Sequence, residues 1–125
     1  MKQGIYQTIH PHTVEEQHGG GNIQHKIYWS LCFYSNSRVG LFGGNKDYFD
    51  PYFKLEFDLN GEVVEVTDNY LEIFILNPFT NIKRIYKGRI EGNRLYLKYY
   101  LEDKPKEISE DVFEYISDIH QVQTP

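Results

Sequence analysis

The sequence contains no alanine, one methionine, one tryptophan and a single cysteine, Cys32. A lone cysteine excludes a disulfide within the chain and agrees with a reducing compartment. Because Cys32 lies inside an apolar stretch, we interpret it as a small buried hydrophobic residue and not as a reactive thiol.

Long apolar runs and surplus positive charge are also missing. No stretch approaches the roughly 18 apolar residues of a membrane span, and the beginning, MKQGIYQTIHPHTVEE, lacks the apolar run of a signal peptide. We therefore expect a cytoplasmic protein that does not associate with membranes. The 13 Lys and Arg residues stand against 18 Asp and Glu, a net charge of −5. This balance argues against nonspecific nucleic-acid binding and makes a basic partner easier to accommodate.

Aromatic residues are abundant, at 16% of the chain with eleven Tyr and eight Phe. This bias favours strands, because flat side chains suit a pleated, half-buried surface. Residues 53–58 alternate apolar and charged side chains, and most of residues 82–101 follow the same period of two. The pairs Asn60-Gly61 and Gly92-Asn93 predict a tight hairpin turn in each region.

Further strands are predicted near residues 3–9, 25–34, 38–43, 70–76 and 107–116. Eight or nine short antiparallel strands must close into an up-and-down barrel or fold into a sandwich to hide their edges. A length of 125 residues predicts a single domain over residues 1–125. Helix signals are weak. The best candidates are HTVEEQH (12–18), with Thr13 as a candidate cap before Glu16, and the acidic tail from Ser109.

The segment 27–42, IYWSLCFYSNSRVGLF, predicts a hairpin with apolar side chains on both faces, which is typical of strands covered on each side. The apolar faces of the alternating strands predict the core: Leu31, Phe33, Phe53, Leu55, Phe57, Ile73, Leu95 and Leu97.

A family resemblance rests on the order Tyr28, Leu31, Phe33, Tyr34, Asn36 and Val39, followed late in the chain by YKGRIEGNRLYL and VFEYI. This pattern resembles the small lipocalin-like barrel proteins of bacteria over about residues 25–116. The glycine usual in the first turn of that pattern is Ser37 here. The resemblance implies a single up-and-down barrel with either a small apolar cavity or a filled core, and it carries over no binding residues.

Catalytic and metal-binding motifs are absent from the sequence. It has no nucleophile elbow, no phosphate-binding glycine loop and no paired cysteines. Glu65 and Glu72 could face each other across neighbouring strands, but their alternation indicates a solvated face. Three histidines, His10, His12 and His18, predict a solvated loop and not a metal site. We therefore expect a protein that is not an enzyme and that holds no cofactor and no metal.

Two classes of function remain open. The first is a lipocalin-like binding protein that holds a small apolar or aromatic ligand in its interior, with these residues as walls: Trp29, Phe33, Phe53 and Phe57. The second is a protein-binding module, such as an immunity protein that neutralises a basic toxin through an acidic, tyrosine-bearing surface: Tyr99, Tyr100, Glu107, Glu110, Glu114 and Tyr115.

The hypothesis of a protein-binding module rests on the separation of basic and acidic residues along the chain. Six basic residues fall within 82–101 and seven acidic residues follow at 102–118. The simpler interpretation of this pattern is cross-strand ion pairing on an exposed sheet. An interior cavity would favour the ligand, whereas a filled core with an exposed tyrosine and acid surface would favour the partner. The aromatic content places the ligand slightly ahead, and the sequence leaves the ligand, the partner and the oligomeric state open.

Overall fold

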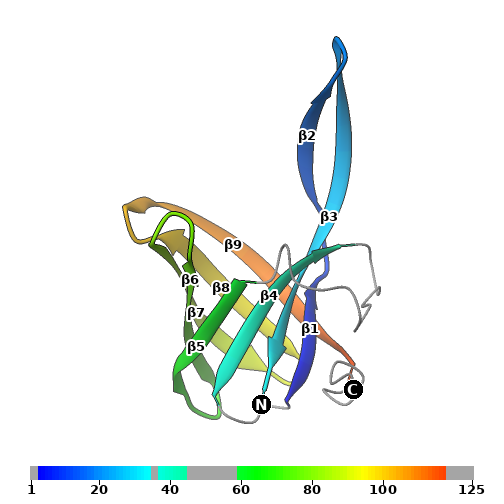
Figure 1. Ribbon diagram of the computed structural model, residues 1–125. Helices are drawn as coiled ribbons and strands as arrows, with labels where there is room; N and C mark the ends of the chain where they lie inside the picture. Colours follow the sequence, from blue (N-terminus) through cyan, green and yellow to red (C-terminus); the bar gives the residue numbers. More distant parts are fainter. Residues whose placement is uncertain (1–2, 35–36, 45–58, 118–125) are drawn as a thin grey trace, which may run out of the picture.

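The computed structural model describes residues 3–34, 37–44 and 59–117, and no helix occurs among these residues. Nine strands form their regular structure (Figure 1): β1 (Gly4–Thr8), β2 (His12–His18), β3 (Gly21–Phe33), β4 (Arg38–Gly44), β5 (Leu59–Val66), β6 (Tyr70–Asn77), β7 (Ile82–Glu91), β8 (Arg94–Leu101) and β9 (Lys104–Ser117). The predicted all-β fold is confirmed.

Eight of these strands close into an antiparallel barrel (Figure 1). Strands that follow one another in the chain pair with one another from β3 through β9, and β1 completes the ring by pairing with both β9 and β3. At this closure Tyr6 lies opposite Leu31 on one side and opposite Tyr115 on the other. The barrel is therefore of the up-and-down type, with β2 inserted between its first two strands.

A two-stranded arm, residues 12–27, projects from one end of the barrel (Figure 1). It consists of β2 and the first half of β3, with His12 opposite Ile27 and His18 opposite Gly21. From Tyr28 onward the same strand β3 pairs with β4, and its last residues also pair with β1. The side chains of residues 22–26 are exposed, so this strand of the arm buries little apolar surface.

Inward-facing side chains fill the middle of the barrel. Their exposed fractions are 2% or less: Tyr6, Leu31, Phe33, Val39, Leu41, Leu71, Ile73, Ile75, Tyr86, Leu95, Leu97 and Phe113. Aromatic rings meet edge to face across strands, as between Tyr6 and Phe33 with centroids 5.6 Å apart. The predicted core residues Leu31, Phe33, Ile73, Leu95 and Leu97 are confirmed as buried. The other three, Phe53, Leu55 and Phe57, lie outside the described residues.

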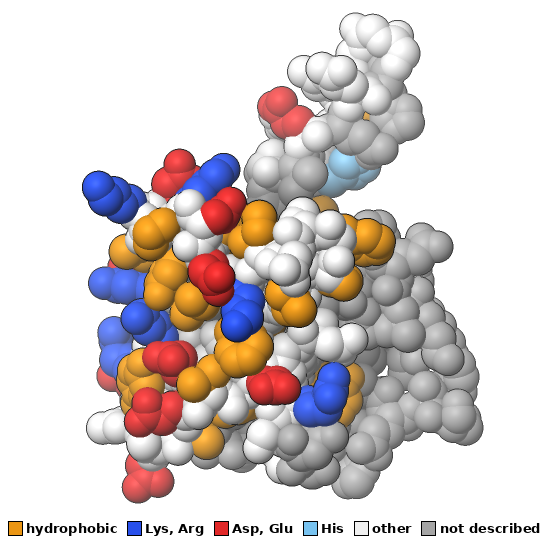
Figure 2. All heavy atoms as spheres, turned by 60° about the vertical axis from the view of Figure 1, so that its left-hand side comes forward, with side chains coloured by type: hydrophobic (Ala, Val, Ile, Leu, Met, Phe, Trp, Pro, Cys, Tyr) orange, Lys and Arg blue, Asp and Glu red, His pale blue; other side chains and the backbone are white. Residues whose placement is uncertain are grey.

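The outer face of β5 to β9 mixes charged and apolar side chains (Figure 2). Arg94 Nη2 lies 2.9 Å from Glu114 Oε2, and Lys98 Nζ lies 3.5 Å from Glu110 Oε1. The predicted cross-strand ion pairs are thus present. Glu65 and Glu72 lie opposite each other on β5 and β6, and Lys87 follows Glu72 on β7, which gives a row of charges across an accessible sheet face.

Two turns follow the expectation from the sequence. Glu91 pairs with Arg94 at the end of the β7–β8 hairpin, and Gly92 adopts a positive φ of 59°, which glycine accommodates without a steric penalty. In the β3–β4 connection Ser37 takes a φ of 63°, a left-handed conformation that residues other than glycine seldom adopt.

Neither of the two weak helix candidates is a helix, and the strand predicted at 107–116 is confirmed. The segment 12–18 is strand β2 and pairs along its whole length with β3. A helix of seven residues is marginal in water, whereas the ladder with β3 satisfies the backbone groups of one edge. The segment from Ser109 belongs to β9, a strand of 14 residues that pairs with β8 and then with β1. Residues 118–125 lie outside the described part of the chain.

The predicted turn at Asn60-Gly61 is also wrong. Both residues lie inside β5, where Gly61 is opposite Val39 on β4 and Ile75 on β6. A Cβ atom built on Gly61 would lie 2.1 Å from the carbonyl oxygen of Phe74. The glycine thus permits close approach of two backbones and not a reversal of the chain.

Candidate functional site

Inward-facing side chains become more exposed toward the end of the barrel that carries the arm. In the middle of four strands they are 2% exposed or less: Leu31, Tyr86, Leu97 and Phe113. Two positions further toward this end, the side chains are partly exposed: Trp29, Arg84, Tyr99 and Asp111. Side chains two residues apart on a strand share a face, so these four line the end of the lumen. We call them the mouth residues.

Arg84 reaches across the lumen. Its strand, β7, stands opposite β3 in the ring of eight strands, yet Arg84 Cζ lies 6.0 Å from the ring centre of Trp29 on β3. The same atom lies 5.6 Å from the ring centre of Tyr99, and Nη1 donates a hydrogen bond of 3.1 Å to the Tyr86 hydroxyl. Within the described residues no carboxylate lies at ion-pair distance from Arg84.

Burial affects the acidity of the two tyrosines beside Arg84. It raises the pKa of Tyr86 to about 12, because removal from water disfavours the phenolate, and the nearby guanidinium of Arg84 acts in the opposite direction. Burial also raises the pKa of Tyr99, and the negative charge of Asp111 adds to this effect. Both hydroxyls are therefore protonated at neutral pH and remain hydrogen-bond donors.

Asp111 connects the mouth to the root of the arm. The Nε2 atom of His12 lies 2.9 Å from each carboxylate oxygen of Asp111, and the Asp111 side chain is only 13% exposed. The negative charge of Asp111 also acts on Tyr99, whose pKa it raises. Because His12 is the first residue of β2, its contact with Asp111 fastens the arm to β9. The carboxylate of Asp111 is thus held by groups of the protein itself.

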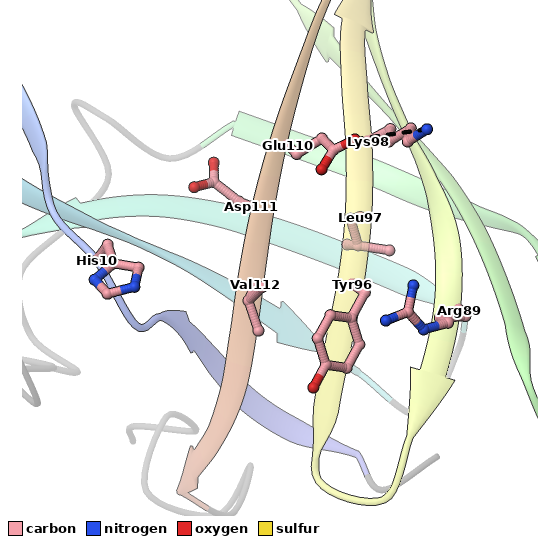
Figure 3. A pocket seen from close by; sticks show the side chains of 8 residues that line it. All are labelled: His10, Arg89, Tyr96, Leu97, Lys98, Glu110, Asp111 and Val112. Carbon is pink, nitrogen blue, oxygen red and sulfur yellow. Dashed lines mark ion pairs between the residues drawn. The ribbon is translucent and has the colours of Figure 1, made fainter.

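A groove lies on the outside of the barrel (Figure 3). It is an open groove of about 570 Å³ along β8 and β9, and its lining is His10, Arg89, Tyr96, Leu97, Lys98, Glu110, Asp111 and Val112. The Arg89 guanidinium lies 4.2 Å from the ring centre of Tyr96, and its Nε atom is 3.2 Å from Glu91. Because Lys98 pairs with Glu110, each cation of the groove has a carboxylate beside it.

The two described residues among the four predicted ligand-binding residues lie in different environments. Trp29 is half-buried at the mouth, beside Arg84. Phe33 is 2% exposed in the filled core, where it packs against Tyr6. Phe53 and Phe57 lie outside the described residues. They belong to the connection between β4 and β5.

The six predicted partner-binding residues do not share one surface. Tyr99 and Tyr115 face the interior and pack against the core, whereas Tyr100 lies on the outer face. Glu107 and Glu110 are exposed. Glu110 and Glu114 are paired with Lys98 and Arg94, so part of the acidic charge is matched within the sheet.

Sequence reasoning missed Arg84 and Asp111 as interior residues. A signal was present, because Arg84 shares the parity of Tyr86 and Ile90, and Asp111 shares that of Phe113. Charged residues near strand ends are usually solvated, so parity alone does not place them in the interior. The contact of His12 with Asp111 joins residues 99 positions apart and has no local signature.

Neither a known family nor a metal site accounts for this arrangement. Across residues 3–34, 37–44 and 59–117, no three His, Cys, Asp or Glu side chains are grouped to hold a metal ion. In the same residues no helix has the length and apolarity needed to cross a bilayer. The chain matches no protein-family model, no curated protein and no solved structure.

Proposed function

We propose that this protein is a non-catalytic binding protein that holds a small apolar or aromatic ligand at the mouth of its barrel, with Trp29 as the main contact. The observation that supports this proposal most strongly is the change in the lumen from a filled core to partly exposed aromatic and polar side chains at the arm end of β3, β7, β8 and β9. Small-molecule sites combine apolar or aromatic walls with a few convergent polar groups, and the mouth residues have this composition.

The filled core argues for a shallow site. Leu31, Tyr86 and Phe113 occupy the lumen directly below the mouth residues with 2% exposure or less. A ligand therefore rests against Trp29 and Tyr99 and does not reach Phe33.

A protein-binding role through the acidic residues has less support, because Glu110 and Glu114 already have basic partners and because Tyr99 and Tyr115 face inward. In a partner complex these side chains would have to exchange existing contacts for new ones.

The proposal is tested by narrowing the mouth. Gly43 lies opposite Trp29 on β4, and a Cβ atom built there would lie 3.2 Å from the Trp29 ring. We expect Gly43→Leu to place its side chain in the mouth and to abolish binding of a neutral aromatic probe, cinnamamide. The adjacent Gly44→Leu is the control, because a Cβ atom at Gly44 meets no atom within 4 Å.

Binding can be followed through Trp29, the single tryptophan of the chain. We expect a saturable change of its fluorescence in the parent protein and in Gly44→Leu, and none in Gly43→Leu, with all three folded by circular dichroism. Equal binding by both variants, or no saturable binding of any small aromatic or aliphatic probe by the parent, would overturn the proposal.

A further inference from the structure

Arg84 is partly buried, and no carboxylate among the described residues pairs with its positive charge. Arginine presents five N–H donors. Among the described residues, the side chain of Arg84 donates one hydrogen bond, to the Tyr86 hydroxyl. Charged groups removed from water are normally paired, because an uncompensated charge is costly in a medium of low dielectric constant. Asp111, the carboxylate among the mouth residues, contacts His12 and forms no ion pair with Arg84.

The aromatic rings around Arg84 favour a planar anion. The rings of Trp29 and Tyr99 lie 6.0 and 5.6 Å from its central carbon. Aromatic rings stabilise a guanidinium by cation–π attraction, and they leave the donors in its plane for hydrogen bonds. A planar carboxylate matches two parallel N–H donors of this plane, and an attached aromatic or apolar body can lie against the indole.

The outer groove lacks this feature. Its cations, Arg89 and Lys98, lie beside Glu91 and Glu110 at 3.2 and 3.5 Å. An incoming anion would have to displace these carboxylates, whereas no described carboxylate is ion-paired with Arg84, and Asp111 in the same mouth contacts His12.

From these contacts we propose that the ligand of the mouth is a small aromatic or apolar carboxylate, whose carboxylate group binds Arg84 while its body contacts Trp29. This inference rests on the proposed function and adds to it the charge of the ligand. Arg84 then serves as the residue that determines specificity for an anion, and Tyr86 positions its guanidinium.

The test compares cinnamate with cinnamamide, which share a planar aromatic body and differ in charge at neutral pH. Fluorescence of Trp29 reports both titrations. We expect cinnamate to bind the parent protein about 10-fold or more tightly than cinnamamide, the factor that corresponds to a hydrogen bond between charged groups.

Arg84→Met removes the charge and keeps most of the volume, so the two probes should bind this variant equally. Arg89→Met is the matched control. It removes an arginine from the same strand, but from the outer face, and the preference for cinnamate should persist. Arg84→Lys covers the case in which Arg84→Met fails to fold. It keeps the charge but not the planar fork, so the preference should fall without disappearing.

The outcomes separate the two proposals. Equal binding of cinnamate and cinnamamide by the parent protein overturns the carboxylate inference and leaves the ligand-binding function standing. A preference for cinnamate that persists in full in both Arg84 variants places the anion elsewhere and also overturns the inference. Binding of neither probe by the parent counts against the function and the inference together.

Discussion

Phe33 shows how burial sets the contribution of a single side chain. Its ring is 2% exposed and meets Tyr6 edge to face, whereas Phe79, in the β6–β7 turn, is 91% exposed. Truncating a buried phenylalanine removes both its transfer free energy and its contacts, and the cavity that remains adds to the loss. We expect Phe33→Ala to lower the free energy of unfolding by about 3–5 kcal/mol. Phe79→Ala should change it by less than about 0.5 kcal/mol, as for other surface sites.

Urea denaturation of the two variants checks this prediction. A loss below about 1 kcal/mol for Phe33→Ala would show that the lumen around Phe33 is loosely filled, and it would favour a deep ligand cavity over a shallow one.

Tyr86 makes stability depend on pH in the alkaline range. Its pKa of about 12 in the folded protein lies above the value of 10.0 expected for an exposed tyrosine. The folded state thus holds a proton that the unfolded state releases, and its contribution to stability is complete below about pH 10 and is lost as the pH rises toward 12. A difference of this size corresponds to about 2–3 kcal/mol.

At neutral pH we expect Tyr86→Phe to lower the free energy of unfolding by about 1 kcal/mol, because the hydrogen bond from Arg84 is lost. Above about pH 10 the difference should shrink, since the variant has no phenol at this position to ionise. Unfolding measured at several pH values from neutral to about 12 checks this; parallel losses in both proteins would contradict it.

Side-chain parity explains which residues could be identified from the sequence. Leu95 and Leu97 are apolar residues that alternate with charged ones, so their burial followed directly from the period of two. Arg84 has the same parity as Tyr86 but the opposite chemistry, and a sequence alone does not reveal whether such a residue lies inside a barrel or at its solvated rim. Only the structure shows that no described carboxylate forms an ion pair with Arg84.

Strand β5 shows how pairing on two sides can override a local turn signal. Asn-Gly is a strong hairpin signal, yet Gly61 lies between β4 and β6 and has no positive φ. An added methyl group would meet the Phe74 carbonyl oxygen and the Ile75 side chain, so we expect Gly61→Ala to lower the free energy of unfolding by about 2 kcal/mol or more. Gly44→Ala, where the added atom meets nothing within 4 Å, should cost far less.

Thermal and urea unfolding of both alanine variants would measure this contrast. If Gly61→Ala and Gly44→Ala had equal effects, Gly61 would not be confined between two backbones, and the pairing of β5 with β6 at this point would be in doubt.

The arm was the element least accessible to sequence reasoning. Barrel strands can be recognised in a sequence because one of their faces must be apolar. In contrast, β2 and the first half of β3 project beyond the barrel, and residues 22–26 are exposed. A hairpin that packs against no core does not need an alternation of apolar and polar side chains. The segment 12–18 therefore retained only a weak capping pattern, which suggested a helix. Besides the continuous strand β3, the contact of His12 with Asp111, far apart in the chain, ties this element to the barrel.

Closure of the ring gives the whole molecule its stability. Every residue of β1 is buried, and this short strand supplies the ladder on one side to β9 and on the other to β3. An eight-stranded ring has no free edges over its paired length, and removing one strand would create two of them. The arm makes no comparable contribution, since it adds to the barrel at one end only.

These roles predict opposite results for two shortened chains. Deleting residues 1–8 should prevent formation of the monomeric barrel, because it removes the buried side chains of Ile5 and Tyr6 and exposes the edges of β3 and β9. Replacing residues 14–25 by Asn-Gly, so that the paired residues Thr13 and Lys26 are joined by a tight turn, should leave the free energy of unfolding within about 1 kcal/mol of the parent value.

Circular dichroism and light scattering would distinguish a folded monomer from an unfolded or aggregated chain. A synthetic peptide of residues 1–8 should restore the deleted protein by adding the missing strand. A folded, monomeric protein without residues 1–8 would show that closure through β1 is not what holds the barrel together. An unfolded protein without the arm would show that the arm contributes to stability.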